Sequence, residues 1–417
     1  MTTEPLHSLG GDDFWWGVAS AGHQVEGGND NADIWFLEQQ QPSVFREPSG
    51  AAIDSWNRWP DDVALTAGLG CNAFRFSVEW ARIEPTPGEF SSAALDHYDQ
   101  MVDACLAAGL TPIVTYNHFA APHWFASRGG FLTDDAGDRF ARYATEVTRR
   151  LGDRLGAAIT FNEPNLHRML AWAGLPEFVR DLERATLEAA ARSADVERYR
   201  VSNVMLPEEF DAYEAGFTHA HTLAKAAIKA ERGDLPIGLS VAMTDDCVVA
   251  GAPTELRDRK RADAYDHWLR LAADDDFIGV QNYERRWYDA EGEVVPDPDA
   301  PKNGMGSAVD PGSLEGAVRY AHQVADVPVL VTEHGMSTPD DTLRAGFLRP
   351  ALEGLAAAVD DSVPVLGYLH WTLADNFEWI FGFEGQLGLH AVDRSTFDRS
   401  PKPSAEVYRQ LIAASRG

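Results

Sequence analysis

The chain has 417 residues, of which 45% are apolar and 24% are charged, and its formal net charge is −30. This composition is typical of a folded globular protein. The acidity argues against a nucleic acid or an anionic membrane as a partner, because both carry negative phosphate groups. The length suits either two or three average domains or one large α/β barrel.

Cysteines are few and scattered, at Cys71, Cys105 and Cys247. They do not form the spacing of a disulfide framework or a zinc site. No stretch of about 18 apolar residues predicts a membrane span, and the first residues lack the basic and apolar regions of a signal peptide. These features predict a protein of the reducing cytoplasm with buried, free thiols.

Short apolar runs alternate with helical patterns along the chain. Eight runs predict strands, at Phe14–Ser20, Ala73–Glu79, Thr111–Asn117, Ala157–Asn162, Pro236–Ala242, Phe277–Tyr283, Pro328–Glu333 and Pro364–Trp371. The patterns between and after them predict helices, at Asp61–Gly70, Ser92–Gly109, Asp138–Gly152, Glu208–Arg232, Glu255–Ala272, Ser313–Ala325, Asp341–Val359 and Ser404–Ala414. Strands without polar alternation indicate a parallel sheet buried on both faces. Eight strand-then-helix units predict a (β/α)8 (TIM) barrel of class α/β, forming one domain over residues 1–417 with long loops, rather than a doubly wound sheet.

The fourth predicted strand ends with an amide and a carboxylic acid, in Thr160-Phe161-Asn162-Glu163-Pro164. Pro164 ends the strand because it has no N–H for the sheet. A turn or a helix cap is the common use of such polar residues. In a barrel, however, active sites lie at the carboxyl ends of the strands, so Glu163 is a candidate catalytic acid if a second carboxylate accompanies it.

Glu333 supplies that second carboxylate, at the end of Val329-Leu330-Val331-Thr332-Glu333-His334-Gly335. Two glutamates at the tops of different strands can face one another across a barrel mouth. Glycoside hydrolysis needs such a pair, one to protonate the leaving oxygen and one to attack the sugar or activate water. Two unrelated, solvated glutamates are the alternative. Further polar or aromatic residues at strand ends favour a site: Gln24, His118, Tyr283, His370 and Trp371.

Five motifs carry a resemblance to a known family. They are Phe14–Ser20 with Gln24 and Glu26-Gly27, then Phe74–Pro85, Thr160–Pro164, Thr332–Gly335 and Gly367–Trp379. In this order, and over nearly the whole chain, they resemble glycoside hydrolase family 1, the retaining β-glucosidases and β-glycosidases. The resemblance implies hydrolysis of gluco-, galacto- or fuco-type β-glycosides through a covalent glycosyl-enzyme, with a small-molecule glycoside as the partner.

The resemblance also implies a role for each matched residue. Glu163 is the expected acid/base and Glu333 the expected nucleophile, with carboxyls about 5–5.5 Å apart, as retaining enzymes require. Arg75 and Tyr283 match residues that contact the nucleophile and would keep it ionised. The expected contacts to the sugar are Gln24, His118, Asn162, Trp371, Glu378 and Trp379, with Trp371 as the aromatic floor. Trp suits this task because its face is apolar and its N–H is polar.

Several positions depart from the family pattern. His334 replaces the usual Asn after the nucleophile, where it can alter the local charge. Gln281-Asn282 precede Tyr283, and Gln386-Leu387 replace an Arg-Phe pair. The segment after Pro164 differs most, and 177–200 predicts a helix over the leaving-group side. Glu378 would repel a phosphate, which argues against 6-phosphosugars.

Alternative functions use the same barrel. A non-catalytic sugar-binding barrel should have lost one of the two glutamates, whereas a transglycosylase or glycosyltransferase would retain both. His118 and His123 have no carboxylate at ligand spacing, so no metal site is predicted. We expect no cofactor, and the sequence leaves the oligomeric state open.

Overall fold

The structure is a computed structural model that describes residues 6–304 and 306–417. Eight parallel strands close into a barrel in the order β1-β10-β9-β7-β5-β4-β3-β2. Their bounds are β1 Trp15–Ala19, β2 Ala73–Ser77, β3 Thr111–Asn117, β4 Ala157–Asn162, β5 Ile237–Ala242, β7 Phe277–Asn282, β9 Val329–His334 and β10 Val365–Trp371. These are the eight predicted strands, and the predicted (β/α)8 barrel is confirmed.

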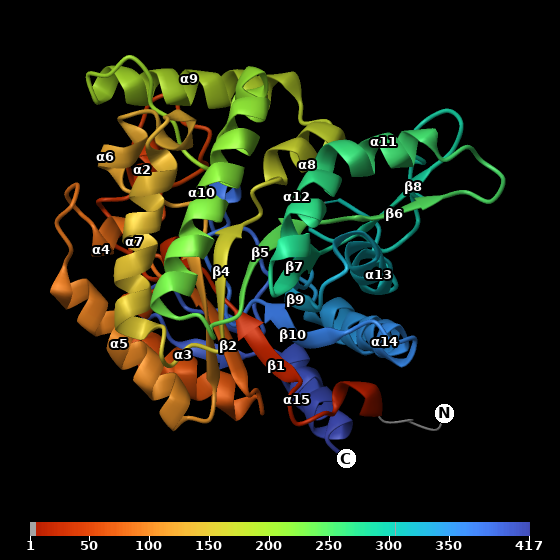
Figure 1. The fold of residues 1–417 in the computed structure, drawn as a ribbon. Coiled ribbons are helices and arrows are strands. Elements are labelled where there is room, and N and C mark those ends of the chain that lie inside the picture. Colours follow the sequence, from red (N-terminus) through yellow and green to blue (C-terminus); the bar gives the residue numbers. More distant parts are fainter. Residues whose placement is uncertain (1–5, 305) are drawn as a thin grey trace.

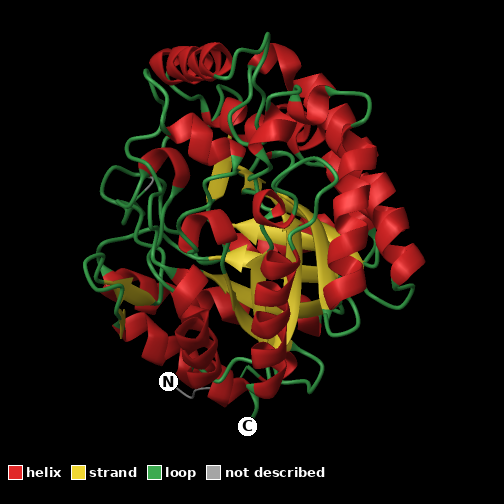
Figure 2. Ribbon diagram, turned by 90° about the vertical axis from the view of Figure 1, so that its left-hand side faces the viewer, coloured by secondary structure: helices red, strands yellow, loops and turns green. Residues whose placement is uncertain are grey.

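Helices surround the strands on the outside, as Figure 2 shows. The outer helices are α3 Ser55–Gly68, α5 Ser92–Ala107, α7 Ala136–Leu151, α10 Phe210–Glu231, α11 Glu255–Ala264, α12 Asp266–Leu271, α13 Ser313–Ala325, α14 Asp341–Asp360 and α15 Pro403–Ser415. Their apolar faces and the outward side chains of the strands form the largest core cluster, which includes Val114, Phe161, Val280 and Val331. The core is thus the layer between barrel and helices.

Two helix predictions were wrong in detail. The predicted helix Glu255–Ala272 is interrupted at Tyr265, where the backbone leaves helical geometry (φ −124°) and the buried hydroxyl lies 2.9 Å from the Thr244 hydroxyl. The predicted helix Asp61–Gly70 begins earlier, at Ser55, because Pro60 lies inside the helix rather than before it. Pro60 is the sixth residue of α3, where its missing N–H removes one intrahelical hydrogen bond without ending the helix.

Short elements that the sequence analysis did not predict lie in the loops. The helices are α1 Gly22–Val25, α2 Asp33–Glu38, α4 Trp80–Ile83, α6 His123–Ala126 and α8 Leu166–Ala173, with 3-10 turns at His7–Leu9, Gly130–Leu132, Pro207–Glu209, Ala272–Asp274 and Trp379–Phe381. Two small sheets pair β6 Asp245–Val248 with β8 Arg285–Tyr288, and β11 His390–Val392 with β12 Arg399–Pro401. The helix expected over 177–200 is α9, Glu177–Ser193, which lies near the top of the barrel in Figure 1.

Inside the barrel, alternate strand residues form a second apolar cluster. Its members include Ala73, Ile113, Ile159, Phe277, Leu330 and Leu369, together with Trp371 from the end of β10. Inward side chains fill such barrels in layers. Arg75 and Thr115 follow two residues after Ala73 and Ile113 on the same strands, so the polar layer lies directly on the apolar one.

Candidate active site

Both glutamate-bearing strands contain an irregularity just before the glutamate. In β4, Ile159 pairs with Gly238 and Asn162 with Ser240, so β4 holds one extra residue. In β9, Val331 pairs with Val280 but Glu333 pairs with Gln281, so Thr332 is the extra residue. An extra residue changes the face on which the following side chains lie. These bulges direct Asn162 and Glu333 into the barrel mouth.

Glu333 is 4% exposed and is held by three donors. Arg75 Nη1 lies 2.6 Å and Gln281 Nε2 2.8 Å from Oε1, and the Tyr283 hydroxyl lies 2.7 Å from Oε2. Burial raises the pKa of Glu333 above its ordinary value, and the positive charge of Arg75 and the hydrogen bond from the Tyr283 hydroxyl offset part of that rise. All three donors favour the ionised carboxylate.

Arg75 also organises Asn162. Its Nη2 donates to Asn162 Oδ1 at 2.6 Å, and its Nε donates to the Thr115 hydroxyl at 3.0 Å. Gln281 Nε2 donates to the same Asn162 oxygen at 2.7 Å. With its oxygen occupied, Asn162 presents its buried Nδ2, which has no partner among the described residues.

Glu163 lies in a different environment. No side-chain hydrogen bond to its carboxyl is present within residues 6–304 and 306–417, and the side chain is partly exposed. Burial and the negative charge of Glu333 raise the pKa of Glu163 well above its usual value, against the lowering effect of Arg75. Repulsion between nearby carboxylates favours protonation of the less supported one. The donors around Glu333 and the repulsion between the two carboxyls therefore favour the proton on Glu163 and the negative charge on Glu333.

The backbone at Glu163 is tightly fixed. Its φ is +45°, which is uncommon for a residue with a side chain and is maintained only by its surroundings. Its N–H donates to the Ser240 carbonyl at 2.8 Å, and its carbonyl accepts from the Leu166 N–H at 3.0 Å. Asn165, fully buried, exchanges hydrogen bonds with the Ala242 backbone at 2.8 and 3.0 Å. These contacts fix the direction of the Glu163 side chain.

Three other candidate residues, His118, Trp371 and Trp379, form a wall of aromatic rings. His118 lies between Trp371 and Trp379, with ring centroids 5.6 and 6.2 Å apart and planes within 15° and 10° of parallel. Trp379 stacks in turn on His23, at 5.7 Å. Burial lowers the pKa of His118 well below its usual value. The wall therefore presents a neutral imidazole and indole faces.

Gln24 and Glu378 complete this wall. Gln24 Nε2 donates to the Phe377 carbonyl at 2.7 Å, which leaves its buried Oε1 without a partner among the described residues. Glu378 Oε1 is likewise unpaired there. Burial, with a further contribution from the charge of Glu333, raises the pKa of Glu378 to about 8.

Buried polar atoms without a hydrogen-bond partner among residues 6–304 and 306–417 gather on these residues. They are Gln24 Oε1, His118 Nδ1, Asn162 Nδ2, Gln281 Oε1 and Glu378 Oε1. Unpaired buried polar groups are uncommon because each costs about 1–3 kcal/mol. A ligand with many hydroxyl groups would satisfy both donors and acceptors of this kind.

His334, by contrast, does not face the site. Its Nδ1 lies 2.8 Å from the Tyr368 hydroxyl, and its ring stacks on Phe347 of α14 at 5.0 Å. Burial lowers its pKa to about 3. His334 is therefore neutral and lies in the core between barrel and helices, so it adds no charge beside Glu333.

Sequence reasoning missed Gln281 as a contact of Glu333 and Asn162, and it missed Asn165 as a support of Glu163. Gln281 was noted only as a departure from a motif, although its place two residues before Tyr283 puts it on the same strand face. No signal in the sequence marks Asn165, because its partners Ala242 and Ala264 are distant in the chain.

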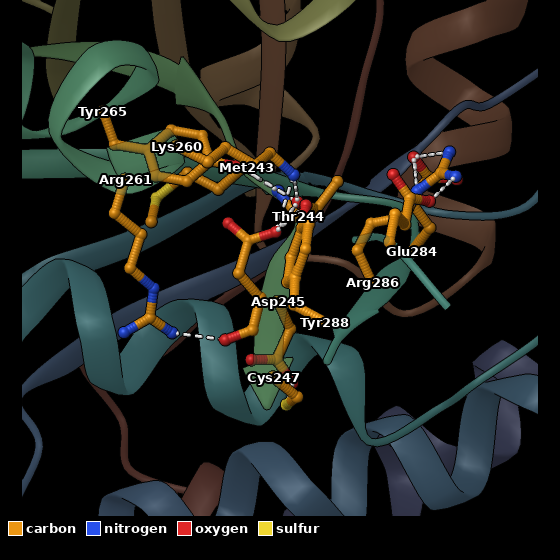
Figure 3. A network of polar contacts seen from close by, with 12 residues as sticks. Met243, Thr244, Asp245, Cys247, Lys260, Arg261, Tyr265, Glu284, Arg286 and Tyr288 are labelled. Atoms are coloured by element: carbon orange, nitrogen blue, oxygen red, sulfur yellow. Dashed lines mark hydrogen bonds and ion pairs between the residues drawn. The ribbon is translucent and has the colours of Figure 1, made fainter. Parts of the chain in front are cut away.

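A polar network supports the neighbouring small sheet of β6 and β8. Figure 3 shows Lys260 and Tyr265 reaching Thr244, with Lys260 Nζ 2.7 Å from the Thr244 hydroxyl. Lys260 also pairs with buried Asp246 at 2.6 Å. The Met243 N–H donates to the Gln281 carbonyl at 2.8 Å. This network holds the chain beyond β5 against the end of β7, which carries Gln281.

Within the part of the chain that the structure covers, no group of three or more His, Cys, Asp or Glu side chains could hold a metal ion. No helix in that part is long and apolar enough to span a bilayer. Cys71 and Cys105 are buried free thiols, whereas Cys247 is only half-buried.

A closed (β/α)8 barrel with two glutamates of opposite protonation preference at its strand ends defines a glycoside hydrolase of the barrel class. The profile of "Glycosyl hydrolase family 1" matches residues 9–190 and 264–416. The chain belongs to glycosyl hydrolase family 1, whose members hydrolyse β-linked glycosides with retention.

Named relatives are similar to this chain over nearly their whole lengths. The chain is 30% identical to a "Bifunctional beta-D-glucosidase/beta-D-fucosidase" of Bifidobacterium breve, covering 96% of this chain and 97% of that protein. It is 29% identical to the human "Cytosolic beta-glucosidase", covering 96% and 97%. The crystal structure of the β-glycosidase BGL167 superposes with a TM-score of 0.90 at 43% identity, covering 97% of both chains.

Proposed function

We propose that this enzyme cleaves β-glycosides by double displacement, with Glu333 as the nucleophile and Glu163 as the acid/base, within one catalytic domain. The contrast between the two carboxyls carries the proposal. Glu333 accepts hydrogen bonds from Arg75, Gln281 and Tyr283, whereas Glu163 has no such donor in the described part of the chain and has a strongly raised pKa. An ionised nucleophile and a protonated acid are the starting states of the retaining reaction.

In the first step Glu333 attacks the anomeric carbon while Glu163 transfers its proton to the leaving oxygen. A covalent glycosyl-enzyme forms and the alcohol departs. Loss of its proton makes Glu163 a base, which then takes a proton from water as the water attacks the same carbon. The sugar is released with retained configuration, and Glu163 regains its proton.

The sugar is placed against the aromatic wall. Trp371 provides an apolar face for the ring, and Gln24, His118, Asn162 and Glu378 offer their unpaired atoms to its hydroxyls. The Trp379 ring lies parallel to His118 at the edge of the same wall. We infer a gluco-, galacto- or fuco-configured sugar, which accords with the glucosidase and fucosidase activities named for the Bifidobacterium relative.

We infer a cytoplasmic location from the free thiols and from the named location of the human relative. Transfer of the sugar to an alcohol instead of water is the second candidate reaction. Both reactions share the glycosyl-enzyme, so incubation with an activated glycoside and an alcohol acceptor distinguishes them by the ratio of free sugar to new glycoside.

The nucleophile is tested with Glu333→Gly and 4-nitrophenyl β-glucoside. We expect turnover to fall by at least about 10⁴-fold, because a covalent step is lost. Added formate should restore release of nitrophenol by occupying the position of the missing carboxylate. The exposed Glu291 provides a control, since Glu291→Gly should keep full activity. Substantial residual turnover of Glu333→Gly without formate would refute the assignment.

A further inference from the structure

A cavity separate from the two glutamates is lined by three arginines. It lies between residues 127–133, which follow α6, and residues 197–200, which follow α9, and its volume is about 180 Å³. None of the residues assigned above to the active site belongs to its described lining. Pockets for drug-sized molecules measure roughly 300–1,000 Å³, so this cavity suits a smaller ligand.

The fold holds the two walls of the cavity together. The Arg200 N–H donates to the Ala126 carbonyl at 3.2 Å. Gly130 has a φ of +56°, and a Cβ there would lie 2.7 Å from the Arg200 carbonyl oxygen, so this approach requires glycine. Tyr199 is fully buried, with its hydroxyl 2.8 Å from His123 Nδ1 of α6. Figure 1 shows α6 beneath α9 on one side of the barrel.

Most arginines of the described chain pair with a carboxylate, but two of those in the cavity do not. Arg200 is paired, because its Nε and Nη2 donate to Glu209 at 2.7 and 2.8 Å. Arg128 and Arg198 have no ion-pair partner among the described residues. Asp and Glu outnumber Lys and Arg by 65 to 35 in the sequence. Two unpaired guanidinium groups in one cavity are therefore unexpected in this protein.

The cavity has an excess of positive charge. Glu197 is the one acidic residue of its described lining. Because Glu209 already neutralises Arg200, the guanidinium groups of Arg128 and Arg198 together oppose the single carboxylate of Glu197. Two cations that share a cavity also repel each other. A bound anion would remove that repulsion and supply the missing counter-charge.

The two unpaired arginines have limited freedom to turn away. The Arg128 guanidinium lies over the Trp124 ring, 5.6 Å from its centroid, which is the geometry of a cation–π contact. Arg198 precedes the buried Tyr199, whose anchoring fixes the backbone from which the Arg198 side chain extends. The cost of ordering these side chains around a ligand is reduced accordingly.

A phosphate group fits this arrangement better than other small ligands do. The planar guanidinium fork matches two oxygens of a phosphate or a carboxylate. A phosphate monoester has three strong acceptor oxygens and up to two negative charges, so it can engage both guanidinium groups at once. A neutral sugar would leave both without a counter-charge. The net charge of −30 opposes approach to an anionic bilayer, so the phosphate belongs to a soluble compound.

We propose that the cavity between α6 and α9 binds the phosphate group of a small soluble compound through Arg128 and Arg198. Arg200, fixed by Glu209, forms the adjoining wall. The site is distinct from the glycoside site and does not depend on the catalytic assignment. The family profile matches residues 9–190 and 264–416, so Arg198 and Arg200 lie in a segment outside that match.

Titration calorimetry with glycerol 3-phosphate at pH 7.5 tests the site in the whole protein. We expect saturable binding at one site per chain, and none with glycerol, which lacks the phosphate. Arg128→Ala and Arg198→Ala should each raise the Kd at least about tenfold, because a hydrogen bond to a charged group is lost. Both side chains are exposed, so both variants should fold. Absence of saturable binding, or an unchanged Kd in both variants, would overturn the proposal.

Arg259→Ala is the matched control. Arg259 of α11 is exposed, has no ion-pair partner among the described residues and lies outside the cavity lining. Its replacement removes the same charge, so the Kd should change less than twofold when NaCl holds the ionic strength constant. If Arg259→Ala weakened binding as much as Arg198→Ala, the anion would respond to net charge alone, and the cavity would not be a site.

Two further variants separate this site from general charge effects and from the catalytic centre. Arg198→Lys keeps the charge but loses the fork, so its Kd should lie between those of the unaltered protein and Arg198→Ala. Glu333→Gly should bind glycerol 3-phosphate with unchanged Kd, whether or not it cleaves glycosides. Loss of binding in Glu333→Gly would place the phosphate in the glycoside site and refute the proposal.

Discussion

Arg75 and Glu333 form a buried ion pair, with Nη1 and Oε1 2.6 Å apart and their side chains 0% and 5% exposed. The same guanidinium reaches Asn162, so one cation supports both the carboxylate that attacks and the amide that faces the sugar. A buried pair is no proof of added stability, because desolvation opposes it. Its effect here is on protonation, since it keeps the charge on Glu333 rather than on Glu163.

Replacing Arg75 should therefore change the pH dependence and not only the rate. In Arg75→Met the pKa of Glu333 rises, because burial then acts without the opposing cation. Activity requires ionised Glu333, so the acid limb of the kcat/KM profile should move upward by at least about one pH unit, with a rate loss of about 10²–10³-fold. Arg75→Lys keeps the charge and should move the limb less. An unmoved limb in Arg75→Met would contradict this account.

The acid role of Glu163 predicts a dependence on the leaving group. Glu163→Ala should lower kcat/KM by about 10²–10⁴-fold for methyl β-glucoside and far less for 2,4-dinitrophenyl β-glucoside, which leaves without a proton. Activity of the unaltered enzyme should fall as pH rises through the raised pKa of Glu163, because the proton is then lost. With the dinitrophenyl substrate, Glu163→Ala should lack this alkaline limb. Equal losses on both substrates would contradict the role.

The strands were predictable because their physical cause is local. Each barrel strand is buried on both faces and therefore appears as a continuous apolar run, and β4 was predicted at its observed bounds, Ala157–Asn162. The break at Tyr265 was not predictable, since the contact that accompanies it is with Thr244, in the distant segment between β5 and β6. Local pattern thus determines the elements, and distant contacts determine where some of them end.

The candidate site also combines features that the local sequence predicts with features that depend on distant contacts. The places of Glu163 and Glu333 at the ends of strands could be predicted, but the bulges that turn Asn162 and Glu333 inward leave no mark in the sequence. A strict alternation from Leu330 would place Glu333 outward, because the two differ by an odd number of residues. The cavity between α6 and α9 was also beyond prediction, since Arg128 and Arg198 reach it from separate segments.

Asn165 links the acid to the neighbouring strand, so its loss should affect both folding and catalysis. Asn165→Ala removes the bonds to the Ala242 backbone and to the Ala264 carbonyl and leaves these buried groups unpaired. Each such group costs about 1–3 kcal/mol. We expect a lower Tm and, at temperatures where the variant is folded, a larger loss on methyl than on dinitrophenyl β-glucoside, because Glu163 is misplaced.

Two measurements check the role of Asn165. Calorimetry gives the Tm, and kinetics at 20 °C below that Tm give the two substrate losses. Asn57 is exposed, and Asn57→Ala should change neither quantity appreciably. If Asn165→Ala lost stability but kept the substrate ratio of the unaltered enzyme, Asn165 would support the fold without positioning the acid.

Asp33 predicts a pH-dependent stability outside the site. It is 1% exposed, its Oδ1 accepts from the Ile34 and Ala121 N–H groups, and its Oδ2 is unpaired within the described residues. Burial raises its pKa to about 7 from an ordinary 3.8. The folded protein thus holds a proton that the unfolded chain has released, so this stabilisation is complete below pH 4 and is lost as pH rises through 7.

Asp33→Asn keeps the accepting oxygen but cannot ionise, so its Tm relative to that of the unaltered protein should rise between pH 5 and pH 8.5, by at least about 2 °C. Differential scanning calorimetry at both pH values measures this change. Asp12→Asn, at an exposed position, should give the same difference in Tm at the two pH values. If the difference in Tm between Asp33→Asn and the unaltered protein were also the same at both pH values, Asp33 would ionise near its ordinary pKa. Only a group that binds protons unequally in the folded and unfolded states makes stability depend on pH.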